Sequence, residues 1–71
     1  TTISFYLPSA MPVIINVIDV NGRIVQSLVN ELMAKGPHTV NWYAGYFSSG
    51  IYYFKLETLA GIKIQKGILI K

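Results

Sequence analysis

The side chains able to do chemistry are few in this chain. They are one histidine, three carboxylates and two adjacent serines: His38, Asp19, Glu31, Glu57, Ser48 and Ser49. Nucleophilic catalysis needs a base within hydrogen-bond reach of the nucleophile and a third group that orients the base. Serine, histidine and aspartate are all present, but neither serine stands in the Gly-x-Ser-x-Gly segment that exposes a nucleophile. We therefore predict that the protein is not an enzyme and has no catalytic residue.

Metal and nucleotide sites lack their ligands as well. One histidine, three scattered carboxylates and no cysteine cannot supply the ligands of a tetrahedral zinc site. No acidic loop has the spacing of a calcium site, and none of the six glycines falls into phosphate-loop spacing. We expect no metal and no cofactor.

The composition is that of a small, apolar and weakly charged domain. The 71 residues are 52% hydrophobic and 13% charged, about half of the charged share usual for soluble domains. This balance excludes a disordered tail, which is polar and highly charged. Two explanations of the low charge stay open: a short chain without disulfides needs a large apolar core, or part of the surface is covered by a partner.

The net charge of +3 is concentrated at one end of the chain. Residues 1–54 carry two basic and two acidic side chains, whereas residues 55–71 carry four lysines and one glutamate. Nucleic-acid binding needs a clustered basic face that neutralises about six phosphates or more, and the whole chain has only six basic residues. We therefore expect no nucleic-acid partner.

Targeting signals and membrane spans are not found in the sequence. No apolar run approaches the roughly 18 residues of a transmembrane helix, and no charged segment precedes an apolar one as in a signal peptide. The first residue is Thr1 rather than methionine. We expect a single domain, residues 1–71, detached from a larger precursor.

Alternation of apolar and polar residues predicts six strands. Their expected ranges are Thr2–Leu7, Val13–Val20, Arg23–Leu28, His38–Tyr43, Ile51–Leu59 and a last strand from Ile62 onward. No segment has a helical period, and turn residues separate the runs. Short strands at this spacing predict an all-β, antiparallel, immunoglobulin-like sandwich of about six to seven strands.

Two connections are expected between these strands. Asn21-Gly22 predicts a type I′ hairpin turn, because both central residues of that turn need positive φ. Residues Val29–Pro37 have no clean period and end at a proline that cannot donate to a sheet. We interpret them as a crossing loop with room for one helical turn.

Two strands carry unusual faces. Both faces of Val13–Val20 contain isoleucine, so this strand is expected to be covered on both sides or to lie at an interface. In the last strand Ile62, Ile64, Ile68 and Ile70 share a face that only Lys66 interrupts. A lysine in that position must snorkel, pair with an acid or lie at a sheet edge.

Six motifs in a fixed order carry a resemblance to a known family. They are Thr2–Pro8, Val17–Val25, Leu28–Glu31, Gly36–Trp42, Ser49–Leu56 and Lys66–Lys71. Together they cover essentially the whole chain, which closely resembles the type A C-terminal sorting domains of the type IX secretion system. The immunoglobulin-like domain of the flagellar hook-capping protein is a more distant likeness.

The resemblance implies a targeting role with specific partners. A cargo protein would precede the domain, pass through the periplasm and reach an outer-membrane translocon that delivers it to the cell surface or the medium. A sortase-like protease would then remove the domain and join the cargo to an anionic lipopolysaccharide. By position Gly50, Tyr52, Lys66 and Lys71 match the family's sorting motifs.

Structural roles stand beside these recognition roles. Gly50 is expected to satisfy a backbone constraint and Tyr52 to fill the core, while Asn21 and Gly22 form the hairpin and Trp42 packs centrally. The chain departs from the family in lacking an upstream Pro-Asn-Pro linker, which places the cleavage site outside it. The alternative function is a retained immunoglobulin-like module for protein-protein assembly at the cell surface, and self-association stays open.

Overall fold

The computed structural model describes residues 1–45 and 47–70, and its regular elements are all strands. They are β1 (Thr2–Leu7), β2 (Met11–Ile18), β3 (Ile24–Met33), β4 (Gly36–Asn41), β5 (Gly50–Thr58) and β6 (Gly61–Leu69). β1 has the predicted bounds. The other strands begin or end within a few residues of their predicted limits, except β3.

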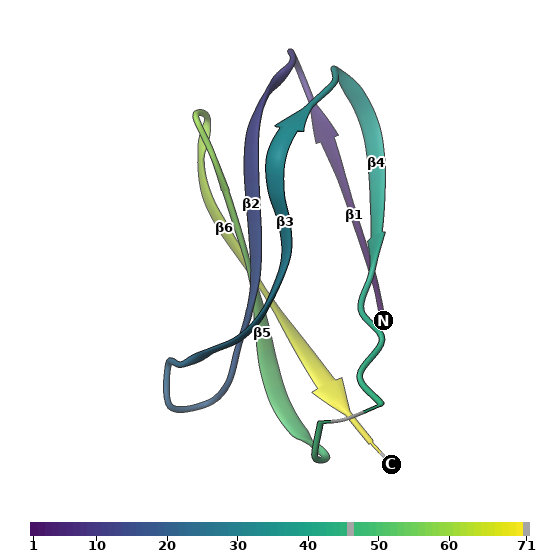
Figure 1. The fold of residues 1–71 in the computed structure, drawn as a ribbon, viewed down its shortest axis with the longest axis vertical. Coiled ribbons are helices and arrows are strands. Elements are labelled where there is room, and N and C mark those ends of the chain that lie inside the picture. Colours follow the sequence, from purple (N-terminus) through teal and green to yellow (C-terminus); the bar gives the residue numbers. More distant parts are fainter. Residues whose placement is uncertain (46, 71) are drawn as a thin grey trace.

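The strands form two antiparallel sheets that face each other (Figure 1). One sheet has two strands in the order β1-β4, and the other has four in the order β3-β2-β5-β6. β3 and β6 are therefore the edges of the larger sheet. The predicted all-β sandwich is confirmed, with six strands in an unequal division of two and four.

The core lies between the two sheets and is built mainly on β2. Val13, Ile15 and Val17 alternate along this strand and are fully buried. Burying each such side chain contributes about 1.5 to 3 kcal/mol. The other buried side chains come from the remaining strands and the segments that connect them: Ile3, Leu7, Met11, Val29, Trp42, Tyr52 and Phe54. All are apolar or aromatic, so the core depends on packing.

The opposite face of β2 has no layer over it in the described residues. Ile14, Asn16 and Ile18 are half-buried between the side chains of the neighbouring strands β3 and β5. Of the two explanations for the apolar character of this strand, cover on both sides is therefore not found. The interface explanation is taken up below.

The predicted crossing loop over Val29–Pro37 is wrong. β3 continues to Met33 because Val29 belongs to the core, and only two residues separate it from β4. Pro37 lies within β4, opposite Tyr6. Hydrogen-bonded residue pairs alternate with pairs that share no hydrogen bond in an antiparallel ladder. Thr1 and Trp42 exchange two backbone hydrogen bonds. Counting from that pair, Tyr6 and Pro37 share no hydrogen bond, so the missing N–H of proline costs no hydrogen bond between the strands.

The hairpin between β2 and β3 forms where predicted, but its turn is of another type. Asn21 does not have positive φ, whereas Gly22 has φ of 83°. The N–H of Gly22 donates to the carbonyl of Asp19 (3.1 Å), and Asp19 Oδ1 accepts from the N–H groups of Asn21 (2.9 Å) and Arg23 (3.0 Å). These hydrogen bonds define a three-residue loop, residues 20–22, that ends in a glycine bulge at Gly22. The side chain of Asp19 organises it.

Candidate recognition surface

The β5–β6 hairpin forms one edge of the four-stranded sheet and carries three of the six basic residues, Lys55, Lys63 and Lys66. Its turn is short, with Gly61 at φ of 130°. Thr58 Oγ1 accepts from the N–H of Ala60 (3.1 Å) and donates to the carbonyl of Gly61 (3.4 Å). Nine residue pairs connect the two strands, from Gly50 opposite Leu69 to Thr58 opposite Gly61. The hairpin is therefore a continuous antiparallel ribbon.

A single close approach decides which face of β6 turns inward. Gly67 lies over the ring of Phe54, and a Cβ atom at this position would stand 2.6 Å from Phe54 Cε2. Real Cβ atoms essentially never show a contact that short, so any other residue would force the buried ring of Phe54 to shift. Because side chains alternate along a strand, Lys63, Gln65 and Leu69 share the inward side with Gly67. The isoleucines of β6 must therefore face outward.

The outward isoleucines make an apolar surface with a lysine in its middle. Ile62, Ile64, Ile68 and Ile70, which we call the isoleucine face, are between 60% and 84% exposed. Lys66 is exposed among them and stands opposite Tyr53 of β5. Of the three expectations for Lys66, the position at a sheet edge is confirmed. A contiguous row of exposed isoleucines on an outer face makes this surface a candidate for interaction with a partner.

The same apolar character continues across the sheet. Ile68 pairs with Ile51 of β5, and Tyr53 pairs with Ile18 of β2, which in turn pairs with Ile24 of β3. Within this row Ile24 is 62% exposed. The acid nearest the isoleucine face is neutralised locally, because Lys55 Nζ lies 3.0 Å from Glu57 Oε1. The surface is thus apolar with a positive centre.

An aromatic cluster supports the hairpin from the inner side. The ring of Trp42 lies 5.4 Å from that of Phe47, 5.1 Å from Tyr52 and 5.4 Å from Phe54, measured between centroids. The indole N–H of Trp42 donates to Gln26 Oε1 (3.0 Å), and the hydroxyl of Tyr52 donates to the carbonyl of Ser48 (2.7 Å). Tyr52 and Trp42 are buried, so both fill the core as their structural interpretations expected.

The remaining predicted motif residues lie in different places. Gly50 is exposed at the start of β5, without positive φ, and a Cβ added there would come no closer than 4.0 Å to Tyr52 Cε2. The expected backbone constraint at Gly50 is therefore not found. Asn21 and Gly22 lie in the β2–β3 hairpin, and Lys71 lies outside the described residues.

The residues considered for catalysis are not brought together. His38 stands near the β3–β4 corner, where its Nε2 lies 2.6 Å from the carbonyl oxygen of Ala34 and its ring stacks on Phe5. Asp19 lies in the β2–β3 hairpin at the other end of the sandwich (Figure 1). Among the residues described, no group of three metal-binding side chains occurs, and no helix could span a membrane.

Comparison with known proteins identifies the family. The sequence matches the profile of the secretion-system C-terminal sorting domain over residues 1–71, the whole chain. This chain belongs to that family. Searches of curated proteins and of solved structures gave no match. The sorting domain is therefore a C-terminal signal for type IX secretion, which implies an attached cargo and export to the cell surface or extracellular space. The family is one of sorting signals rather than enzymes.

Sequence reasoning missed the outward orientation of the isoleucines of β6. Ile62, Ile64 and Ile68 were seen to share a face, but nothing assigned that face to the outside. The signal that could have done so is Gly67, because it is the glycine that lies within the strand, whereas Gly61 on the same side adjoins the turn and has positive φ. A glycine opposite an aromatic residue in the partner strand marks the face that must approach another group closely.

Proposed function

We propose that the isoleucine face, with Lys66 at its centre, is the surface by which the outer-membrane translocon recognises the folded sorting domain. The observation that carries this proposal is the outward orientation of the isoleucines, which leaves them exposed on an edge strand. A cargo fused ahead of residue 1 would reach the periplasm first and then be presented through this face. The positive centre favours a translocon surface that is apolar with an acidic group facing Lys66.

A secretion assay tests the recognition surface directly. A reporter with a general export leader is fused ahead of residues 1–71 in a Gram-negative host that has the type IX machinery. Variants Lys66→Glu and Ile68→Thr change the face while keeping residues that suit a strand surface. We expect both to leave the reporter in the periplasm, whereas the unchanged domain delivers it to the surface or medium.

A matched control separates the effect of altering the isoleucine face from the effect of changing the net charge. Lys35→Glu makes the same charge change at the exposed β3–β4 corner, away from the isoleucine face, and should be delivered normally. Point variants are more informative than deletion of residues 66–71, because the deletion also removes Gly67 and Leu69 on the inward side of β6. Normal delivery of folded Lys66→Glu and Ile68→Thr would place recognition elsewhere on the domain.

We further propose that a sortase-like protease removes the domain after transport and joins the cargo to an anionic lipopolysaccharide. The support is the membership in the sorting-domain family. The alternative is a retained immunoglobulin-like module whose isoleucine face mediates assembly at the cell surface. Immunoblots of the surface reporter decide between them: a product without residues 1–71 supports removal, and a product that keeps them supports the retained module.

A further inference from the structure

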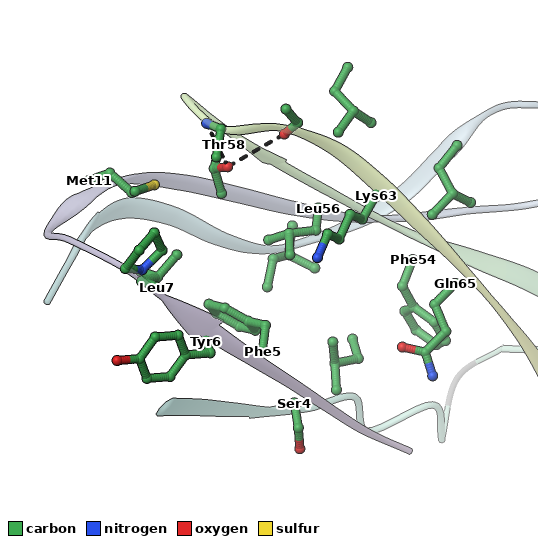
Figure 2. Close-up of a pocket in the computed structure, with 17 residues that line it drawn as sticks. Ser4, Phe5, Tyr6, Leu7, Met11, Phe54, Leu56, Thr58, Lys63 and Gln65 are labelled. Atoms are coloured by element: carbon green, nitrogen blue, oxygen red, sulfur yellow. Dashed lines mark hydrogen bonds between the residues drawn. The ribbon is translucent and has the colours of Figure 1, made fainter. Parts of the chain in front are cut away.

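A groove of about 730 Å³ opens along the inward side of β6, and its lining reaches Ile62 and Ile64 of the isoleucine face. Phe54 and Leu56 form its apolar floor, and Phe5 and Leu7 of β1 line the opposite wall. Figure 2 shows Lys63 and Gln65 extending from β6 over this floor. The volume is that of a ligand-binding cleft, and the function proposed above makes no use of it.

The groove exists because the two sheets have different widths. The four-stranded sheet ends at β6, whereas the two-stranded sheet ends at β1. In the described part of the chain, β1 pairs only with β4, and β6 pairs only with β5. Both strands line the groove, so two unpaired strand edges border the same apolar cleft.

The backbone of β1 presents free hydrogen-bonding groups along this edge. Thr1 and Trp42 exchange backbone bonds of 2.8 and 3.3 Å. By the alternation of an antiparallel ladder, Thr2, Ser4 and Tyr6 stand at non-bonded pairs with β4. Their N–H and C=O groups therefore point away from β4. An edge of this kind is a template for one more strand.

The charge of the groove specifies the chemistry of its occupant further. Among the described residues that line it, Lys63 is the one whose side chain is ionised. No carboxylate stands in the lining, and in that part of the chain Lys63 makes no ion pair. Its ammonium end lies over the apolar floor in Figure 2. An occupant with a carboxylate at this point would complement the groove.

From these three observations we infer that the groove binds an extended peptide segment of another protein, added as a strand to the free edge of β1. Its alternate side chains would pack on Phe54 and Leu56, and an acidic residue would pair with Lys63. A strand as long as β1, six residues, spans about 20 Å. The groove and the isoleucine face share Ile62 and Ile64, but Lys66 and Ile68 do not line the groove, and Lys63 and Lys66 lie on opposite sides of β6.

A second copy of this chain fits the groove less well. Pairing two β1 edges would place residues 1–8 of the second copy in the cleft, and that stretch contains no acid. Of the three carboxylates in the chain, Asp19 is bonded in its hairpin loop and Glu57 is paired with Lys55. That leaves Glu31, exposed on the edge strand β3, as the acid that a second copy would have to present. A fatty acid would satisfy the floor and Lys63 but would leave the β1 edge unpaired.

Short synthetic peptides test the inference on the intact chain. The probe is a fluorescein-labelled peptide of about seven residues in which valine and threonine alternate around a central glutamate. One matched peptide has lysine in place of the glutamate, and another has N-methylated residues that cannot donate to a strand edge. By fluorescence anisotropy we expect the glutamate peptide to bind about tenfold more tightly than either.

Variants of the two lysines of β6 assign the binding to one side of the strand. Lys63→Glu should reverse the preference, so that the lysine peptide binds more tightly than the glutamate peptide. Lys66→Glu makes the same charge change on the isoleucine face and should leave both affinities unchanged. With the glutamate peptide bound, amide exchange of Thr2, Ser4 and Tyr6 should slow, which a peptide lying elsewhere would not cause.

Three results would overturn the inference. Equal binding of the glutamate and lysine peptides would remove the role of Lys63. Unchanged amide exchange along β1 would show that no strand is added there. Slower amide exchange along β1 on addition of decanoate, with no change on addition of any of the peptides, would assign the groove to a lipid. None of these outcomes bears on the secretion assay, so the two proposals fail independently.

Discussion

The ring of Phe54 and the backbone of Gly67 are in such close contact that the pair fixes the orientation of β6. A Cβ at Gly67 would stand 2.6 Å from Cε2 of the ring and 3.2 Å from Cζ. The ring also packs edge-on against Trp42, with centroids 5.4 Å apart, and Phe54 is buried. Because the ring is held on both sides, the side of β6 that carries Gly67 must be the inner side.

Gly67→Ala is expected to destabilise the fold because the added methyl group overlaps the Phe54 ring. Overpacking of this kind costs about 1 to 3 kcal/mol. Urea unfolding followed by the fluorescence of the single tryptophan, Trp42, measures it. Gly50→Ala is the control, since its Cβ meets nothing closer than 4.0 Å, and its unfolding free energy should change by less than about 0.5 kcal/mol. Equal effects of the two variants would contradict the contact.

The orientation of β6 shows where prediction from the sequence reaches its limit. The alternation of Ile62, Ile64 and Ile68 was plain, and it placed all of them on one face. Hydrophobicity alone would bury that face. The deciding contact joins Gly67 to Phe54 across two strands, and such a contact becomes visible only when the register of the hairpin is known.

The two corrected connections have local physical causes. Val29–Pro37 was interpreted as a loop because Glu31, Lys35 and Pro37 interrupt the period, yet edge strands tolerate charges and a proline at a non-bonded position. At Asn21-Gly22 the hairpin was predicted from the residue types alone. The carboxylate of Asp19 accepts two backbone N–H groups and selects a longer loop. Most strands and the core alternation were predicted because period two is a local property.

Trp42→Ala is expected to lower the free energy of unfolding by about 3 to 5 kcal/mol, because the indole is central to the aromatic cluster. That loss is comparable to the whole stability of a small domain. Gln26→Leu isolates the hydrogen bond to the indole N–H and should cost about 1 to 2 kcal/mol. Far-UV circular dichroism with urea measures both. Unaltered stability of Trp42→Ala would place the indole on the surface.

Asp19→Ala should destabilise the β2–β3 hairpin by about 1 to 2 kcal/mol, since two N–H groups lose their acceptor. Asp19→Asn keeps a side-chain oxygen and should retain most of the stability. Thermal melts of the two variants measure the difference. Identical melting midpoints would indicate that the loop is organised by Gly22 alone, whose φ of 83° already favours the bulge.

Ile68→Thr and Val17→Thr make a matched pair that tests whether the isoleucine face is open to solvent in the isolated domain. Ile68 is 65% exposed, whereas Val17 is fully buried. Burial of an added hydroxyl without a partner costs about 1 to 3 kcal/mol, so Val17→Thr should lower the unfolding free energy by that amount. Ile68→Thr should change it by less than about 1 kcal/mol while shortening retention on a hydrophobic-interaction column. If the loss in Ile68→Thr equals that in Val17→Thr and grows with protein concentration, the face is covered by self-association, and the translocon must then compete with a second copy for it.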